Sequence, residues 1–155
     1  MWADYALLNK CLNAKIFNNS LKLRDENIMQ KNLLLKAQRN TEAGIWAEKK
    51  EYFDVAVSRF YYALYEKIIY ISKKEGFYKK PPRKNPHNFV IENFKKNIFT
   101  KLENRDFISV SRLTRLKKRR VYADYKEDII ESENDFKLMF KNHYNKIAQI
   151  LGRFI

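Results

Sequence analysis

Apolar residues recur at spacings of three and four along most of the chain, which predicts helices throughout. One segment carries a long stripe at this spacing: Phe53, Val57, Phe60, Leu64, Ile68 and Ile71. A second stripe of Val55, Tyr62 and Ile69 makes the same helix apolar around most of its circumference. Because such a helix belongs at the centre of a bundle, we expect it to be the central helix and to end near Gly76.

The segments before this helix predict two shorter ones. A helix over residues 3–17 should stop at the turn cluster Asn18-Asn19-Ser20. A second helix should run over residues 26–49, weakened locally by Gly44. Residues 1–27 are therefore predicted to form an N-terminal helical extension.

The segments after the central helix complete the prediction. Residues 79–86 form a basic, proline-stiffened loop, and the stripe that follows predicts a helix up to Leu102. A turn is expected at residues 104–106, before a helix over residues 108–116 that runs into a basic cluster. Ser132 opens the last helix with a capping-box arrangement. The prediction is an all-α fold, an up-and-down bundle of four or five helices over residues 28–155 with the extra N-terminal helix.

Composition supports this class and excludes others. Three Gly and three Pro in 155 residues are too few turn residues for a many-stranded β fold. A lone Cys11 cannot build a disulfide framework or a cysteine-based zinc site, and it suggests a reducing compartment. Apolar runs are far too short for a membrane span, and Asp4 interrupts any signal-peptide core. We therefore expect a cytoplasmic protein.

The formal net charge of +14 is concentrated in one stretch. Residues 79–120 hold 14 basic and three acidic residues, a net +11. Such a block repels itself and is best neutralised by a phosphate backbone, although an idle basic surface remains the alternative. The residues expected to contact RNA are Lys79, Lys80, Arg83, Lys84, Arg112, Arg115, Lys117, Lys118 and Arg119. Among these, Arg112, Arg115 and Arg119 have the spacing of one helix face.

Three short strings carry the candidate chemistry. The central helix contains Ser58-Arg59-Phe60-Tyr61-Tyr62-Ala63-Leu64-Tyr65, the next helix opens with His87-Asn88-Phe89-Val90-Ile91, and the basic helix ends in Arg120-Val121-Tyr122-Ala123-Asp124-Tyr125. In this order the strings resemble the HEPN superfamily, in particular the branch with Arg-x-x-Ala-Asp-Tyr after a helix with a Tyr-Tyr-Ala core. The resemblance covers roughly residues 31–155.

The resemblance implies a fold, an assembly and an activity. HEPN bundles pair into dimers whose arginine motifs face a shared cleft, and catalytic members are metal-independent ribonucleases with an Arg, four to six residues, then a His. A ribose 2′-hydroxyl attacks the adjacent phosphate, a guanidinium stabilises the developing charge and a histidine moves protons. No metal or other cofactor is expected. Family members are often paired with a small nucleotidyltransferase antitoxin that neutralises them, in some cases by modifying a tyrosine near the motif, here Tyr122 or Tyr125.

The motif departs from the catalytic pattern at its last position. Arg120 is followed after four residues by Tyr125, whose phenol, with a pKa near ~10, is a poor base but can donate a proton or hydrogen bond. His87 either reaches the cleft and supplies the missing imidazole or caps its helix after Pro86. Asp124 is expected to orient Arg120 or to cap a helix. His143 lies on the apolar stripe of the last helix, where a core or interface role is expected.

The central helix is expected to support this site. Tyr61, Tyr62 and Tyr65 fit the core by spacing, and their hydroxyls need partners such as Arg59 or Asp124. Base stacking by these rings is the alternative. Ser58, Arg59 and Tyr62 are the predicted core and supporting residues behind the catalytic set Arg120, Tyr125, Asp124 and His87.

Three functions follow from these observations. The leading hypothesis is a dimeric, metal-independent endoribonuclease of a toxin–antitoxin or defence system. The alternative is a non-catalytic module that binds RNA, a nucleotide or a protein partner through the same cleft. A third is a structural or inhibitory subunit that engages an acidic or RNA-containing complex through residues 1–27. Membrane attachment is not expected, because no helix combines a basic face with a large apolar one.

Overall fold

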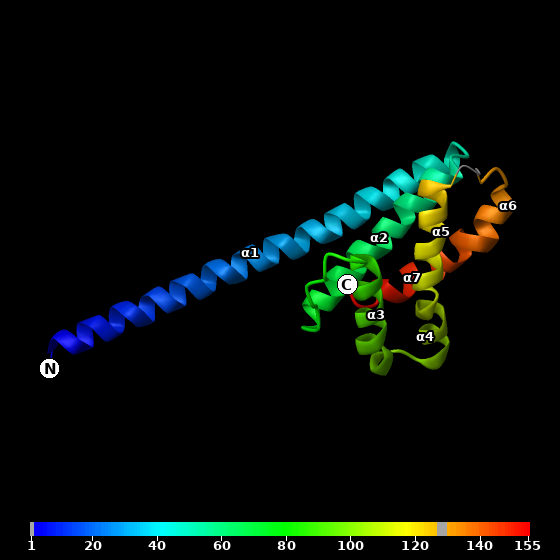
Figure 1. Cartoon of the computed structure of the whole chain (residues 1–155). Helices are drawn as coiled ribbons and strands as arrows, with labels where there is room; N and C mark the ends of the chain where they lie inside the picture. Colours follow the sequence, from blue (N-terminus) through cyan, green and yellow to red (C-terminus); the bar gives the residue numbers. More distant parts are fainter. Residues whose placement is uncertain (1, 127–129) are drawn as a thin grey trace. The chain divides into compact units, whose positions relative to one another are not determined.

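The structure, a computed structural model, describes the backbone of residues 2–126 and 130–155 and the side chains of residues 21–126 and 130–155. Every regular element within these ranges is helical, which confirms the all-α helical-bundle prediction (Figure 1). The elements are α1 (Trp2–Lys49), α2 (Phe53–Lys74), α3 (Pro86–Ile98), the 3₁₀ turn η1 (Phe99–Lys101), α4 (Asn104–Ser111), α5 (Leu113–Tyr125), α6 (Glu133–Phe136), the π-helical segment η2 (Lys137–Lys141) and α7 (Asn142–Gly152).

Helix α1 replaces the two N-terminal helices that the sequence predicted. It runs from Trp2 to Lys49 without a break, so the predicted turn at residues 18–20 is wrong. Asn and Ser lower helix propensity by less than about 1 kcal/mol each, and no Gly or Pro occurs before Gly44 to stop the helix. The chain divides into two compact units, residues 1–32 and 33–155, whereas the predicted boundary lay at residue 27.

In the unit of residues 33–155, α2 is the central helix. All six residues of its predicted long stripe are buried, and the second stripe is only partly covered, with Val55 exposed. Helix α2 packs against α3, α5, α6 and α7, and Figure 1 shows α5 and α7 beside it. Gly44 of α1 faces the Phe60 ring of α2, where an added Cβ would lie 2.7 Å from a ring carbon.

The segment after α3 differs from its prediction. The predicted turn at residues 104–106 is the first turn of α4, in which the buried Asp106 forms an ion pair with Arg153. Helix α3 ends at Ile98 rather than at Leu102. A break at Arg112 separates α4 from α5. Just before this break, the Ser111 hydroxyl donates a hydrogen bond to the Ile108 carbonyl (2.7 Å). Such a local bond competes with the backbone hydrogen bonds of the helix.

The last helix begins as predicted. The Asp135 N–H donates to the Ser132 hydroxyl (3.3 Å), and α6, η2 and α7 follow without a break. Of its predicted stripe, Phe136, Phe140 and Ile147 are buried, while Phe154 is half-buried. None of the helices in the described part of the chain has a stretch long and apolar enough to cross a membrane.

Candidate functional site

The three strings that carry the candidate chemistry lie on α2, α3 and α5. Helix α2 packs along α5 and against α3, and α3 also contacts α5. His87 is the second residue of α3 and Arg120 lies in the second half of α5. Tyr61, Tyr62 and Tyr65 lie in the middle of α2, and each contacts His87 or Arg120.

Arg120 is held by neighbours on two helices. Its Nη2 donates to the Tyr62 hydroxyl of α2, and its Cζ lies 4.9 Å from the Tyr62 ring centroid. One helical turn further along α5, the Asp124 Oδ2 lies 2.7 Å from the buried Arg120 Nε in an ion pair rather than a directed hydrogen bond. The Arg120 side chain is 15% exposed. These contacts fix the guanidinium and leave a small part of it accessible.

His87 contacts two tyrosines of α2. Its Nδ1 lies 2.8 Å from the Tyr61 hydroxyl, and its ring stacks on Tyr65 with centroids 4.1 Å apart. Burial lowers the pKa of His87, and the positive charges of Arg120 and Lys117 lower this pKa further. The imidazole is therefore neutral at pH 7, the state in which it can accept a proton.

The Tyr62 ring links the two groups. It lies 4.9 Å from the Arg120 Cζ and 6.0 Å, centroid to centroid, from the His87 ring. His87 thus adjoins the same tyrosine ring as Arg120, as the first of its two predicted roles requires. The N-cap of α3 is Asn85, in a left-handed conformation without a side-chain capping bond. A permanent cation and a neutral imidazole that adjoin the same ring are groups that can stabilise an anionic transition state and transfer a proton.

The tyrosine hydroxyls have partners other than those predicted. Tyr61 pairs with His87 and Tyr62 with Arg120, whereas the sequence suggested Arg59 or Asp124. Arg59 is exposed, on the polar side of α2 that its two apolar stripes leave uncovered. Burial raises the pKa of Tyr61 and raises that of Tyr65 to about 12, so both phenols remain protonated.

Tyr125 ends α5 and is 73% exposed. Its ring centroid lies 5.7 Å from the Arg120 Cζ, a cation–π distance. Tyr125 therefore lies beside the arginine but in solvent, where it can present its hydroxyl to a ligand. Ser58, another predicted supporting residue, is half-buried and lines a hollow together with Asp124.

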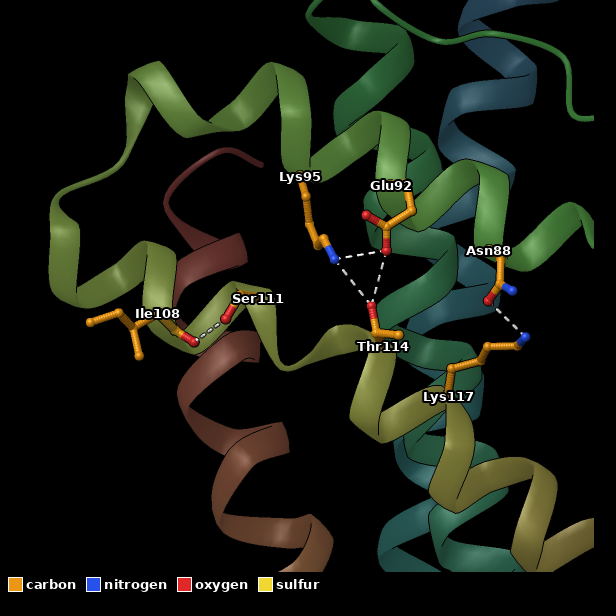
Figure 2. A network of polar contacts seen from close by, with 7 residues as sticks. All are labelled: Asn88, Glu92, Lys95, Ile108, Ser111, Thr114 and Lys117. Atoms are coloured by element: carbon orange, nitrogen blue, oxygen red, sulfur yellow. Dashed lines mark hydrogen bonds and ion pairs between the residues drawn. The ribbon is translucent and has the colours of Figure 1, made fainter.

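A polar network joins α3 to α5 (Figure 2). These two helices carry His87 and Arg120. Lys95 donates to Glu92 (2.7 Å) and to the Thr114 hydroxyl (3.1 Å), and Thr114 donates to the same Glu92 oxygen (3.1 Å). One turn closer to Arg120, the Lys117 ammonium donates to Asn88, the residue next to His87 (2.7 Å). Lys117 is half-buried, which makes it partly structural in addition to its predicted contact with RNA.

The other predicted RNA-contacting residues are spread over several surfaces. Lys79, Lys80, Arg83 and Lys84 are exposed in the loop before α3, and Arg115 and Lys118 are exposed on α5. Arg119 is half-buried and lines a hollow of about 450 Å³ together with Glu131 and Asp135.

Arg112 lies in the break before α5, so the predicted single helix face of Arg112, Arg115 and Arg119 is interrupted. Arg112 Nη1 donates to the Nδ1 of His143 (3.0 Å). His143 is half-buried at the start of α7. Burial and the charges of Arg112 and Arg115 lower the pKa of His143.

Two functional neighbours were not assigned from the sequence. Tyr61 was assigned to the core by its spacing, and its hydroxyl contacts His87 directly. Asn88 was part of a motif string without an assigned role, and it accepts a hydrogen bond from Lys117. The sequence marks these two residues only by their positions, because Tyr61 precedes Tyr62 and Asn88 follows His87. Within the described residues, no three His, Cys, Asp or Glu side chains form a cluster that could hold a metal ion.

Comparisons of the chain with protein-family models, with curated proteins and with solved structures gave no match.

Proposed function

We propose that the chain is an RNA-directed, HEPN-type protein, a metal-independent endoribonuclease that acts as a dimer in the cytoplasm within a toxin–antitoxin or defence system. The observation that carries the proposal is the pairing of a fixed Arg120 with a neutral His87 around the Tyr62 ring. The exposed basic loop of residues 79–84, which leads directly into His87, supports a polyanionic substrate.

The chemistry is a transesterification within RNA. The 2′-oxygen forms a bond to the adjacent phosphorus, the bond from phosphorus to the 5′-oxygen breaks, and the products are a 2′,3′-cyclic phosphate and a free 5′-hydroxyl. Arg120 stabilises the negative charge that develops on the phosphate oxygens. His87 accepts the 2′-hydroxyl proton, for which its Nδ1–H must donate to the Tyr61 oxygen so that Nε2 keeps a lone pair.

Asp124 and Tyr125 complete the proposed site. Asp124 positions Arg120 through its contact with the Nε atom. Tyr125, exposed beside the guanidinium, donates a hydrogen bond or a proton toward the leaving 5′-oxygen. Tyr125 alone cannot replace a histidine as base, so the proposal assigns that step to His87.

Cleavage of single-stranded RNA in the presence of EDTA tests the activity. The wild-type protein should give products that end in a cyclic phosphate, and Arg120→Ala and His87→Asn should each lower the rate by at least about 100-fold. Arg39→Ala removes an exposed arginine of α1 and serves as the matched control. Cleavage that survives Arg120→Ala unchanged would refute the assignment.

The alternative is a module that binds RNA, a nucleotide or a protein partner without catalysis. It is favoured by the small exposed fraction of Arg120 and by its ion pair with Asp124, both of which suit a structural arginine. This alternative predicts binding that weakens steeply with salt and no cleavage product on a gel.

The proposed dimer and partner have separate tests. A homodimer that brings two Arg120 sites to one cleft should elute at twice the monomer mass, and a monomer at working concentration excludes the shared cleft. A nucleotidyltransferase antitoxin should co-purify with the chain and abolish cleavage, and a partner engaged through residues 1–27 should be lost when these residues are removed.

A further inference from the structure

A hollow of about 210 Å³ adjoins the candidate site. It lies where the first two turns of α2 meet the last turn of α5. Its lining residues are Asp54, Val55, Ser58, Arg59, Ala123 and Asp124. The proposed cleavage reaction uses only one of them, Asp124.

The lining combines groups suited to a planar polar ligand. Asp54 and Asp124 supply carboxylate acceptors, Arg59 supplies an exposed fork of N–H donors, and Val55 and Ala123 supply apolar surface. A flat ring could therefore lie against the apolar side chains with its edge toward the charged ones.

Asp54 has capacity for a ligand that donates hydrogen bonds. Its two carboxylate oxygens lie 3.3 and 3.4 Å from the Ile130 backbone nitrogen. Both are long contacts, and the two oxygens share this one N–H donor. Burial raises the pKa of Asp54, and the Ile130 N–H offsets this rise only in part. N–H groups brought by a ligand would stabilise the ionised carboxylate.

The hollow connects directly to Arg120. The Asp124 carboxylate forms part of the lining and lies 2.7 Å from the Arg120 Nε. A nucleobase bound in the hollow would thus place its own ribose and phosphate within reach of the guanidinium. This arrangement couples base recognition to the position of the phosphate that is cleaved.

We propose that this hollow binds a guanine base of single-stranded RNA, an inference that rests on the proposed function. Guanine presents two parallel donors, N1–H and the N2 amino group, that match one carboxylate, and its O6 and N7 acceptors match an arginine fork. Cytosine and adenine each offer a single donor group on the edges that these side chains would read, and uracil offers one N–H between two acceptors. Guanine alone satisfies both a bidentate carboxylate and a bidentate arginine.

The test compares short RNAs that differ at one base. Each oligonucleotide carries one guanosine in an adenosine background, and the variants replace it with inosine, 7-deazaguanosine or adenosine. Inosine removes the N2 amino group and 7-deazaguanosine removes the N7 acceptor. The wild-type protein should prefer guanosine by about tenfold or more in cleavage rate or, by fluorescence anisotropy with EDTA present, in affinity.

Protein variants assign the preference to the hollow. Asp54→Asn should reduce the preference for guanosine over inosine, and Arg59→Met, at an exposed position, should remove the preference over 7-deazaguanosine while the fold stays intact. Asp135→Asn, an exposed carboxylate that lines the hollow of about 450 Å³, is the matched control and should change neither ratio.

The outcomes separate the two proposals. Equal binding and cleavage of all four oligonucleotides, with Arg120→Ala inactive, overturns guanine recognition and leaves the proposed ribonuclease intact. A preference that survives both hollow variants also overturns it, because another surface then reads the base. No binding and no cleavage of any RNA overturns both proposals.

Discussion

Gly44 allows α1 to approach α2 closely, and replacing it with alanine tests this contact. A Cβ at position 44 would lie 2.7 and 2.8 Å from the Phe60 Cδ1 and Cε1 atoms, closer than van der Waals contact permits. The Phe60 ring is fully buried, and its centroid lies 4.5 Å from the Tyr144 ring centroid and 3.7 Å from the Lys141 ammonium nitrogen. The ring therefore has little room to move away.

Two opposing contributions set the expected size of the effect. Alanine stabilises a helix interior by about 1 kcal/mol relative to glycine. Overpacking a well-filled core costs about 1–3 kcal/mol. Gly44→Ala should therefore lower the free energy of unfolding by up to about 2 kcal/mol. For a chain of this length each kcal/mol corresponds to about 2–4 °C, so the melting temperature should fall by as much as about 8 °C.

Gly152→Ala is the matched control, because a Cβ there meets no atom within 4 Å. This variant should be neutral or stabilised by up to about 1 kcal/mol. The melting temperatures of both variants are measured by thermal unfolding, monitored by near-UV circular dichroism because this signal reports on aromatic packing. Adding Phe60→Leu to Gly44→Ala should relieve the clash, so the two changes should destabilise by less than their sum. A Gly44→Ala protein that melts at or above the Gly152→Ala temperature would refute the argument.

Further predictions concern ion pairing, capping and pH. Asp106→Asn should destabilise by about 1–2 kcal/mol in urea unfolding, because it leaves the half-exposed Arg153 without its charge partner; an effect no larger than that of an exposed Asp→Asn change would contradict this. Ser132→Ala should lower stability by about 1 kcal/mol, since it removes the capping acceptor of the last helix, and an unchanged urea midpoint would exclude the cap as a contribution. Stability should fall as the pH drops below about 6.5, because His87 and His143 have lowered pKa values in the folded state and the unfolded chain then binds more protons. Replacing both histidines with Gln should flatten this part of the pH profile; a slope that persists would assign it to other groups.

Much of the fold followed from local pattern. The stripe of α2 identified the central helix because burial of a helix face requires apolar residues at three- and four-residue spacing. The Ser132 cap followed from chemistry within one turn. The predicted turns at residues 18–20 and 104–106 were wrong, because turn propensities of about 1 kcal/mol are easily outweighed by an uninterrupted helix or by a buried contact such as that of Asp106.

The candidate site could be predicted only in part. The motif strings identified Arg120 and Asp124, whose spacing of four residues on one helix brings their side chains together. The sequence could not choose between the two roles of His87, since its neighbours Tyr61 and Tyr65 come from another helix. Packing also decided how far the polar side of α2 is covered: Arg59 is exposed, and Ser58 is half-buried.

The helical class, the central helix and the concentration of positive charge in residues 79–120 could be read from the chain alone, because each depends on residue type and on spacing along the chain. Packing between helices brings His87 and Arg120 to the Tyr62 ring and pairs the Tyr61 and Tyr62 hydroxyls with these two residues. It also brings Asp54 and Asp124 into the lining of one hollow. The two phenol contacts join residues 26 and 58 positions apart, and each lies between separate helices. Their geometry depends on how α2, α3 and α5 pack, which the periodicity of any single helix does not specify.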